Sequence, residues 1–431
     1  MSAVLRKKIQ TKKAKVAVIG LGYVGLPIAV NFAKAGFNVF GLDKDEDRVR
    51  QLQEKKSYIS DIPSREVADV VQKGKFSASL DFSILKTIDA IIICVPTPLK
   101  RKYTPDVTYI LSAVKTIQKY MKKNTLVILE STTYPGTTEE MIKPILEQNG
   151  FTAGKDFFLS FSPERIDPGN KTYDVTTIPK VVGGLDAVSG QLTKILYEKV
   201  IKRIHIVSSA KAAEMTKLLE NSFRIINIGW INEVAMMCHK LGIDVWEVIE
   251  AAKTKPFGFM PFYPGLGVGG HCIPDDPLYL YWKAKHHGFS SKYIKLSADI
   301  NSSMPHYAVE RLKGALKRKS IKGAKILVLG VTYKKDIRDL RKSPPIDLIE
   351  ILKKYRAVVD YSDPIIPYLK MGTIDLLSVP LTEKNLKKYD CVVIGTDHTQ
   401  VNYKLVLKAS KRIYDVKNIF GSVVNKKIIR F

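Results

Sequence analysis

Cys272 is the residue of this chain whose type and surroundings most favour covalent chemistry. It follows the run GLGVGGH, from Gly265 to His271, in which glycines expose backbone N–H groups and let a substrate come close. Both conditions favour the nucleophilic thiolate form of a cysteine. Cys94, Cys238 and Cys391 stand in apolar stretches instead, as small buried hydrophobes do. The residues alone make Cys272 a candidate nucleophile, with a structural cysteine as the alternative.

Lys217 and Asn221 form a second candidate pair. They are four residues apart in a stretch with helical spacing of apolar residues, so they share one face of a helix. Two donors on such a face would stabilise an oxygen that acquires negative charge during a reaction. A lysine that is merely solvated remains the alternative interpretation of Lys217.

A glycine-rich turn near the start of the chain predicts a dinucleotide site. The sequence GLGYVG begins at Gly20, directly after a short apolar run and before a helical one. Gly20 permits a tight turn, Gly22 lets the backbone approach a pyrophosphate, and Gly25 allows close packing of the helix. The N–H groups at the helix start attract the phosphates. Asp43 ends the next apolar run and would bind the ribose hydroxyls, which favours NAD over NADP.

These residues require a framework of alternating strands and helices. Continuous apolar runs are typical of strands buried on both faces of a parallel sheet. We expect strands at 15–19, 38–43, 90–95, 125–129, 325–330, 358–361, 391–394 and 412–415, and helices at 27–35, 209–240, 245–252, 297–316 and 344–355. Residues 255–277 contain so many prolines and glycines that we expect a loop there.

The predicted fold is therefore α/β, with two Rossmann-like doubly wound domains joined by a central helical domain. We place an NAD-binding domain at 1–208, a helical domain carrying the catalytic loop at 209–315, and a second Rossmann-like domain at 316–431. The last domain has only Gly330 where a full fingerprint needs three glycines. A second NAD site is therefore not expected.

The composition excludes several classes of function. Hydrophobic residues make up 45% of the chain and charged residues 26%, which is typical of a globular protein. The net charge of +27 is spread along the chain without a zinc-finger or RNA-binding signature, so we expect solvated surface charge and no nucleic-acid partner. No apolar run is long enough for a membrane span, and the basic N-terminus has no signal-peptide core. Four cysteines form no disulfide framework, which favours the cytoplasm.

Taken together, the motifs resemble the UDP-glucose/GDP-mannose dehydrogenase family. The similarity covers nearly the whole chain in order and spacing. The motifs are GLGYVG, STTYPG at 131–136, SPER at 162–165, the helix of Lys217 and Asn221, GGHCIPDDP at 269–277 and YKKD at 333–336. Residues 256–282 are most similar to the branch that oxidises UDP-N-acetylhexosamines, especially UDP-N-acetylglucosamine 6-dehydrogenases.

The resemblance implies oxidation of a sugar C6 alcohol to a carboxylate, with two NAD⁺ and one water. Cys272 would form a thiohemiacetal and then a thioester. Lys217 and Asn221 would stabilise the C6 oxygen, Asp276 would act with Lys217 in proton transfer, Glu164 would assist thioester hydrolysis, and Thr132 would hold a water near the nicotinamide.

The resemblance also implies binding residues. The cofactor would contact Gly20, Gly22, Tyr23, Val24, Gly25, Asp43, Arg48, Thr97, Thr132 and Arg341, although Arg48 reads equally well as a surface arginine. The UDP-sugar would contact Glu164, Lys217, Asn221, Tyr263, Gly265, Gly267 and Lys334. No metal is expected, and the central helices of the family imply a homodimer.

Two departures from the UDP-glucose enzymes concern the sugar. Those enzymes carry lysine where Asp275 and Tyr263 stand here, which favours an N-acetylated sugar. UDP-N-acetylglucosamine is the expected substrate, and UDP-glucose and UDP-N-acetylmannosamine are the alternatives. His271 would polarise Cys272 or simply pack beside the loop.

Three rival functions remain at this stage. A 2-hydroxyacid dehydrogenase would share the glycine turn but would not need Cys272. A regulatory protein would bind the nucleotide sugar without producing NADH. A nucleic-acid binder would be retained on DNA or RNA at physiological salt.

Overall fold

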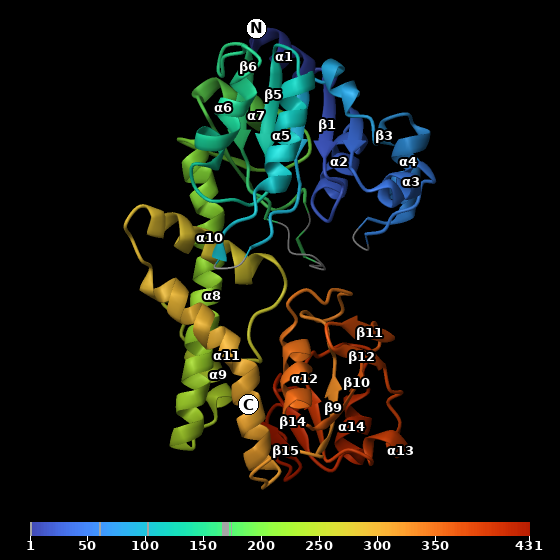
Figure 1. The fold of residues 1–431 in the computed structure, drawn as a ribbon, viewed down its shortest axis with the longest axis vertical. Coiled ribbons are helices and arrows are strands. Elements are labelled where there is room, and N and C mark those ends of the chain that lie inside the picture. The colour runs from blue at the N-terminus through green and yellow to red at the C-terminus, as the bar shows by residue number, and fades with distance from the viewer. Residues whose placement is uncertain (1, 60–61, 101–102, 166–171, 174) are drawn as a thin grey trace. The chain divides into compact units, whose positions relative to one another are not determined.

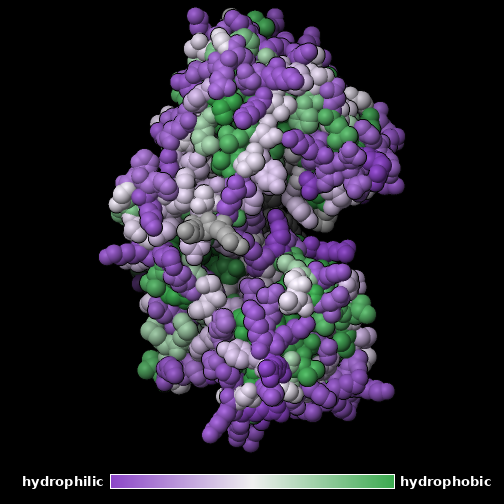
Figure 2. All heavy atoms as spheres, in the orientation of Figure 1, coloured by the Kyte–Doolittle hydropathy of each residue, from purple (hydrophilic) through white to green (hydrophobic). Residues whose placement is uncertain are grey.

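The computed structural model describes residues 2–59, 62–100, 103–165, 172–173 and 175–431, and the chain divides into two units. Unit 1 comprises residues 1–220 and 282–288, and unit 2 comprises residues 221–281 and 289–431. Figure 1 labels the elements of both. In Figure 2, hydrophilic side chains form much of the visible surface of each unit, in line with the high content of lysine and arginine.

Unit 1 is built on an eight-stranded sheet with the strand order β3-β2-β1-β4-β5-β6-β7-β8. The strands are β1 (Lys15–Ile19), β2 (Asn38–Leu42), β3 (Phe76–Ser79), β4 (Ala90–Ile93), β5 (Thr125–Leu129), β6 (Phe157–Phe161), β7 (Lys180–Gly184) and β8 (Ile204–Val207). All neighbours pair in parallel except β6 and β7. The reversal of strand order at β1 and β4 is the switch point at which such sheets bind ligands.

Helices cover both faces of this sheet. They are α1 (Ser2–Gln10), α2 (Gly25–Lys34), α3 (Glu46–Gln53), α4 (Ser64–Gln72), α5 (Thr108–Tyr120), α6 (Lys143–Glu147) and α7 (Ala187–Tyr197), with short turns at η1 (Phe82–Thr87) and η3 (Thr137–Ile142). On β1, Val16 and Val18 lie in one apolar core and Ala17 and Ile19 in another. Because side chains alternate along a strand, the continuous apolar run reflects burial on both faces.

Unit 2 contains a five-stranded parallel sheet with the order β10-β9-β13-β14-β15. Its strands are β9 (Lys325–Leu329), β10 (Val358–Ser362), β13 (Cys391–Ile394), β14 (Ile413–Asp415) and β15 (Ile428–Arg430), beside a hairpin of β11 (Tyr368–Met371) and β12 (Ile374–Leu377). The helices are α9 (Val245–Lys253), α11 (Lys292–Ala315), α12 (Pro344–Lys354), α13 (Glu383–Leu386) and α14 (Tyr403–Ala409). Helix α10 (Cys272–His286) begins in unit 2, and its last residues belong to unit 1. Helix α8 (Ala210–Leu241) begins in unit 1 and continues into unit 2.

The central helices and the second sheet share one apolar core within unit 2. Ile231 of α8, Met304 of α11, Val328 of β9 and Ile349 of α12 all belong to it. The expected α/β class, with two parallel-sheet domains and a helical middle, is confirmed. The domain limits at 208 and 315 remain a prediction.

The prediction of a loop at 255–277 was wrong for its last residues, because α10 begins at Cys272. Pro274 falls in the first turn, where backbone N–H groups have no partner within the helix, so the ring costs no hydrogen bond there. Pro277 lies inside the helix and does remove one. The strands β3, β6, β7, β8, β11, β12 and β15 were missed.

Candidate active site

The glycine turn after β1 has the geometry expected of a dinucleotide site. Gly20 has φ of +90°, and a Cβ there would lie 2.6 Å from the carbonyl oxygen of Cys94. A Cβ on Gly25 would lie 1.8 Å from the carbonyl oxygen of Gly20, whereas a Cβ on Gly22 would meet nothing within 4 Å. Gly20 and Gly25 are therefore required by packing within the protein. Gly22 borders open space, which fits the approach of a pyrophosphate.

Asp43 connects the end of β2 to this turn. Its carboxylate is buried and accepts a 2.7 Å hydrogen bond from the backbone N–H of Leu21. The guanidinium of Arg48 lies 3.5 Å from the same carboxylate and above the ring of Tyr58. Tyr58, which the sequence did not single out, donates to the carbonyl of Leu21 at 2.6 Å. The residues present thus fit the adenosine end of a dinucleotide, with Arg48 beside Asp43.

The remaining expected cofactor residues of unit 1 lie in turns after strands. Tyr23 is exposed and Val24 half-buried at the start of α2, Thr97 is buried in the turn after β4, and Thr132 is half-buried after β5. Carboxyl ends of neighbouring parallel strands meet at one edge of a sheet. Strands β1, β4 and β5 are neighbours in this sheet, so these turns share one edge of it.

Glu214 holds the Thr132 turn in place, and the sequence did not predict this. The fully buried carboxylate accepts hydrogen bonds from the backbone N–H groups of Gly136 (2.6 Å) and Thr138 (2.9 Å) and from the Thr138 hydroxyl (2.7 Å). It therefore caps η3 from the first turns of α8. Burial raises the pKa of Glu214 to about 7, although the three hydrogen bonds oppose the shift.

Lys217 and Glu164, both predicted site residues, are in contact. The Lys217 Nζ donates to the Glu164 carbonyl oxygen at 2.6 Å and lies 3.4 Å from its carboxylate. Both side chains are buried. A pocket beside Glu164 is also lined by Arg165 and Lys180. A buried ammonium in contact with a buried carboxylate is suited to stabilising an oxyanion and to positioning a water.

Asn221 and Asp276, two further predicted residues, are also joined. The Asn221 amide donates to Asp276 Oδ2 at 2.6 Å, and both side chains are buried. Helical geometry places Asn221 one turn after Lys217 on α8. Asp276 stands one turn after Cys272 on α10, as the spacing would require if that segment were helical.

Cys272 is half-buried at the first position of α10. The N-terminus of a helix carries a partial positive charge, which favours a thiolate. Burial raises the pKa of the Cys94 thiol well above its usual value and that of Cys391 to about 12. Those two cysteines, like buried Cys238, thus fit the structural role predicted for them.

The glycines before Cys272 are needed for close packing within unit 2. A Cβ on Gly269 would lie 2.7 Å from the carbonyl oxygen of Lys342, and one on Gly270 would lie 2.9 Å from the ring of Tyr333. The N–H of Gly270 donates to the carbonyl of Arg341 at 2.9 Å. The segment that carries the nucleophile is therefore docked directly on residues 333–342.

Asp275 reinforces this docking. It is buried, and its two oxygens pair with Lys342 and with His271 Nδ1, the latter at 3.2 Å. His271 thus orients the loop through Asp275, which favours the packing alternative for this histidine. A lysine at position 275 would bring a second cation to Lys342.

The expected sugar-binding residues lie on a neighbouring stretch. The N–H of Gly265 donates to Asn232 Oδ1 at 2.9 Å, and the Asn232 amide donates to Asn301 at 2.9 Å. A Cβ on Gly267, whose φ is +121°, would lie 2.5 Å from the Asn301 carbonyl oxygen. The Tyr263 hydroxyl donates to Glu250 at 3.0 Å.

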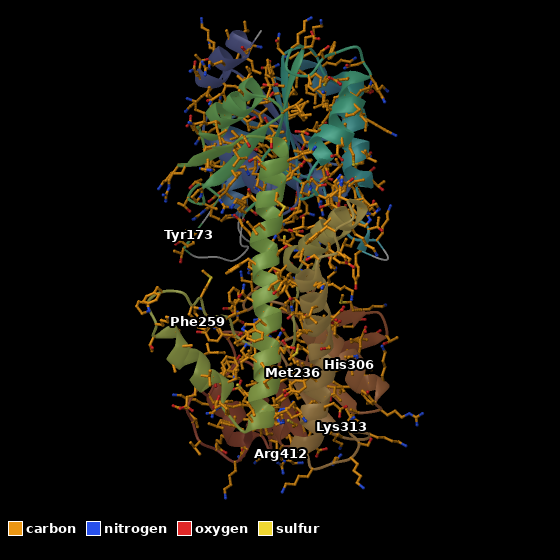
Figure 3. All side chains as sticks on the ribbon, turned by 90° about the vertical axis from the view of Figure 1, so that its left-hand side faces the viewer. Tyr173, Met236, Phe259, His306, Lys313 and Arg412 are labelled. Atoms are coloured by element: carbon orange, nitrogen blue, oxygen red, sulfur yellow. The ribbon has the colours of Figure 1, made fainter. Side chains whose placement is uncertain are left out.

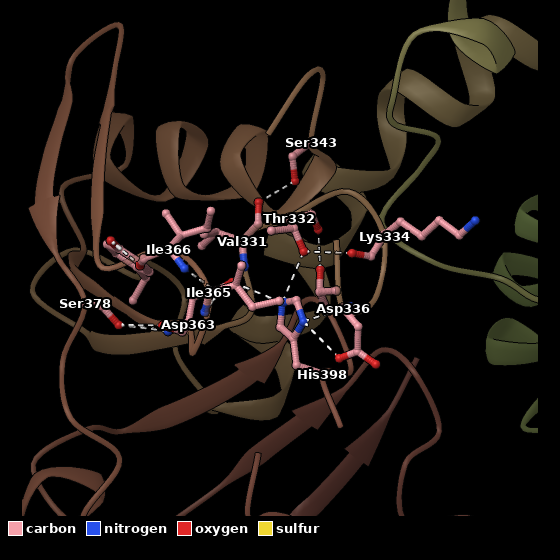
Figure 4. A network of polar contacts seen from close by, with 12 residues as sticks. Val331, Thr332, Lys334, Asp336, Ser343, Asp363, Ile365, Ile366, Ser378 and His398 are labelled. Atoms are coloured by element: carbon pink, nitrogen blue, oxygen red, sulfur yellow. Dashed lines mark hydrogen bonds and ion pairs between the residues drawn. The ribbon is translucent and has the colours of Figure 1, made fainter. Parts of the chain in front are cut away.

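Lys334 and Arg341 lie in the segment after β9. Arg341 pairs with Asp339 at 2.6 Å, and this ion pair is the main cause of the raised pKa of Arg341. Lys334 is half-buried and points away from the polar network around His398 (Figure 4). The described residues hold no group of His, Cys, Asp and Glu side chains suited to a metal ion. Among the described helices, none is long and apolar enough to cross a bilayer.

Each unit therefore gathers part of the predicted site. Unit 1 contains the glycine turn, Asp43, Arg48, Thr97, Thr132, Glu164 and Lys217, and unit 2 contains Asn221, Cys272, Asp276, Tyr263, Gly265, Gly267, Lys334 and Arg341. Tyr58, Glu214, Asn232, Asn301 and Lys342 were missed. Of these five residues, only Glu214 carried a signal that could have been noticed, because an acid in a helix is rarely buried unless it is paired.

Three family models match the chain in sequence order. They describe the NAD binding domain (residues 14–201), the central domain (211–303) and the UDP binding domain (327–422) of the UDP-glucose/GDP-mannose dehydrogenase family. The first of these models confirms NAD as the expected cofactor, and its range includes the glycine turn and Asp43.

Relatives and solved structures are similar to this chain over nearly its full length. The chain is 37% identical to UDP-N-acetyl-D-glucosamine 6-dehydrogenase of Pseudomonas aeruginosa, covering 94% of this chain and 97% of the relative. It is 36% identical to UDP-N-acetyl-D-mannosamine dehydrogenase of Pyrococcus horikoshii, covering 94% and 96%. The solved UDP-D-ManNAc dehydrogenase from Pyrococcus horikoshii superimposes with a TM-score of 0.86 at 35% identity, covering 96% of this chain and 98% of that one.

Proposed function

The chain belongs to the UDP-glucose/GDP-mannose dehydrogenase family and is an NAD-dependent UDP-sugar 6-dehydrogenase, and we propose that it oxidises a UDP-N-acetylhexosamine. The first candidate for this substrate is UDP-N-acetylglucosamine. The observation that carries the proposal is the position of Cys272. It opens α10 at the end of a glycine segment that is docked on the UDP-binding domain.

When bound, NAD⁺ would supply the oxidising power of both oxidation steps, as the acceptor of a hydride from C6. Asp43 would bind its adenosine ribose and Arg48 its adenine side. Thr132 would hold a water near the nicotinamide, and Arg341 would contribute at that end. None of these residues forms a bond with the sugar.

Cys272 acts between the two oxidations. Its thiolate adds to the C6 aldehyde, and the resulting alkoxide takes a proton to give a thiohemiacetal. Loss of the second hydride from C6 and of the hydroxyl proton gives a thioester, which water hydrolyses to the carboxylate and the free thiol. The tether keeps C6 in place and prevents loss of the aldehyde.

The buried polar residues manage charge and protons. Lys217 and Asn221 stabilise the C6 oxygen while it is negative. Asp276, held by Asn221, takes part with Lys217 in proton transfer. Glu164, which lines a small pocket, orients the hydrolytic water. Each role matches the burial and partners of that side chain.

Asp275 and Tyr263 support the choice of an N-acetylated sugar. The loop residue Asp275 contacts Lys342 and His271, so it forms part of the docking of the Cys272 segment. The UDP-glucose enzymes have lysine at this position and at Tyr263. UDP-N-acetylmannosamine is a second candidate, because the relative from Pyrococcus horikoshii carries that name and is almost as similar.

The experiment is NADH formation from a panel of UDP-sugars at equal concentration. The panel contains UDP-glucose and the UDP derivatives of N-acetylglucosamine, N-acetylmannosamine and N-acetylgalactosamine. The proposal expects the highest kcat/KM with UDP-N-acetylglucosamine. A highest value with UDP-N-acetylmannosamine would select the second candidate, and one with UDP-glucose would contradict an N-acetylhexosamine enzyme.

We also propose that the enzyme is a homodimer. Phe223, Trp230, Met237 and Leu241 recur at helical spacing on α8, and all four are exposed. Figure 3 shows the lower part of α8 lying beside α11, with Met236 labelled on it. An apolar stripe of this length favours a second copy of the same chain as its cover. Light scattering should give twice the mass of 48.4 kDa for the protein and a lower mass for Trp230→Glu.

A further inference from the structure

The UDP-binding domain repeats the glycine-and-acid connection of the NAD-binding domain. Gly20 donates its N–H to Leu42 at 2.8 Å, and Gly330 donates to Ser362 at 2.9 Å. Leu21 donates to Asp43 Oδ2 at 2.7 Å, as Val331 donates to Asp363 Oδ2 at 2.8 Å. Both glycines have positive φ, +90° and +80°. Asp363 is therefore the structural counterpart of the acid that binds the ribose of NAD.

His398 distinguishes the glycine-and-acid connection of the UDP-binding domain from that of the NAD-binding domain. Ile19 pairs with Ile93 and Leu329 with Ile394, so Thr97 and His398 each stand four residues past equivalent strand positions. His398 is completely buried, and its Nε2 lies 3.2 Å from Asp363 Oδ2 (Figure 4). The acid that would face a ribose in a dinucleotide site here faces an imidazole. Hydrogen bonds from the N–H groups of Ile365 and Ile366 occupy its other oxygen.

The directions of the hydrogen bonds made by His398 follow from the backbone N–H of Asp336, which can only donate. The N–H of Asp336 donates to His398 Nδ1 at 3.0 Å, so the ring hydrogen is on Nε2. Nε2 then donates to Asp363 and to the Thr332 hydroxyl, which lies 3.1 Å away. The Thr332 hydroxyl in turn donates to the carbonyl of Lys334 at 2.9 Å. One imidazole thus forms hydrogen bonds with Thr332 and Asp336, on either side of Lys334 in the sequence.

This segment needs such support. Asp336 has a positive φ of 59°, a left-handed conformation that non-glycine residues adopt rarely and that the surrounding structure must stabilise. Its carboxylate accepts hydrogen bonds from the Thr399 N–H (2.9 Å) and hydroxyl (3.0 Å). His398 and Thr399 together therefore fix Asp336 from the loop after β13.

We propose that His398 is a positioning residue for the UDP-sugar: joined to Asp363, it shapes residues 332–336 so that Lys334 is presented to the substrate. The inference rests on the proposed function, in which Lys334 binds the UDP-sugar. It also explains why this second nucleotide fold would not bind a dinucleotide, since its acid is engaged internally. The role is one of binding, and it leaves the chemistry at Cys272 unchanged.

Two variants separate the hydrogen bond at Nδ1 from those at Nε2. In His398→Asn the side-chain oxygen can still accept from the Asp336 N–H, whereas the bonds of Nε2 to Asp363 and Thr332 are lost. In His398→Gln the amide reaches the Nε2 position and can donate to Asp363, whereas the bond to Asp336 is lost. His398→Ala removes all three bonds. His205→Gln, at an exposed histidine of β8, is the matched control.

The experiment measures kcat, KM for the UDP-sugar, KM for NAD and the Kd of UDP by calorimetry. We expect KM for the UDP-sugar and Kd for UDP to rise about 10-fold in His398→Ala, with partial rescue in His398→Gln, because a lost hydrogen bond weakens binding by about that factor. KM for NAD and kcat should change less than about twofold. The control should match the unmodified enzyme.

The outcomes distinguish this inference from the proposed function. An unchanged Kd for UDP in all folded His398 variants would overturn the positioning role. So would a fall in kcat alone with a lower Tm, which indicates a purely structural histidine; the Gln variant provides the test if Ala does not fold. If no UDP-sugar yields NADH but His398→Ala still weakens UDP binding, the inference stands and the proposed function fails.

Discussion

The amide of Asn221 donates a 2.6 Å hydrogen bond to Asp276 Oδ2, which joins α8 to the first turns of α10 across 55 positions of sequence. Both side chains are buried, so neither can exchange this bond for one with bulk water. A buried carboxylate that loses a donor is destabilised by about 1–3 kcal/mol. The bond therefore both holds the start of α10 and sets the orientation of a proposed proton-transfer group.

The first prediction concerns this pair. Asn221→Ala should lower kcat about 100-fold, because an oxyanion donor and the orientation of Asp276 are lost together. A double-mutant cycle of Asn221→Ala and Asp276→Ala, measured by urea unfolding, should give a coupling energy of about 1–3 kcal/mol. Asn227→Ala is the matched control, because the Asn227 amide binds a carbonyl of its own helix. Additive effects in the cycle would show that the pair does not interact energetically.

The second prediction concerns cofactor choice. Asp43→Asn should lower kcat/KM for NAD about 10-fold, because the charge that binds the ribose hydroxyls is lost. Discrimination against NADP should weaken in the same variant, since a 2′-phosphate no longer meets a carboxylate. Asp45→Asn, which alters the cap of α3 two residues further on, provides the control. Equal preference ratios in both variants and the unmodified enzyme would exclude Asp43 as the ribose ligand.

The third prediction concerns stability and pH. Burial raises the pKa of Glu214 to about 7 in the folded protein, against 4.5 as its ordinary value. A raised folded pKa gives a contribution that is present below pH 4.5 and is lost as the pH rises through 7. The unfolding free energy of the unmodified enzyme, relative to that of Glu214→Gln, should therefore fall by up to about 3 kcal/mol between pH 5 and pH 8. Parallel pH dependences of the two proteins would refute the shift.

The site residues that could be predicted from sequence were those whose chemistry is local. The turn from Gly20 to Gly25 lies within one segment, and the helix spacing of Lys217 and Asn221 follows from their numbers. Cys272 could be distinguished from Cys94 and Cys391 because its neighbours are glycines rather than apolar strand residues.

The supporting contacts could not be predicted in this way. Glu214 caps Gly136 from 78 positions away, and Lys342 reaches Asp275 from 67 positions away. No local pattern encodes such pairs, since they form only when distant segments pack. The start of α10 was missed for a different reason: Pro274 signals a loop by its type but is tolerated in the first turn of a helix.

The fourth prediction concerns the nucleophile. Cys272→Ser should lower the rate of acid formation by about 1000-fold or more, since a serine hydroxyl is a poor substitute for a thiolate. Cys238→Ser is the control, because Cys238 is buried in the core of unit 2. An unchanged rate in Cys272→Ser would remove the covalent mechanism.

The central claim is a complete four-electron oxidation through Cys272. The most direct test is the amount of NADH formed per UDP-N-acetylglucosamine when the sugar is limiting and NAD⁺ is in excess, with the product identified by mass spectrometry. The account predicts two NADH and the C6 carboxylate. One NADH with accumulation of the C6 aldehyde would contradict it.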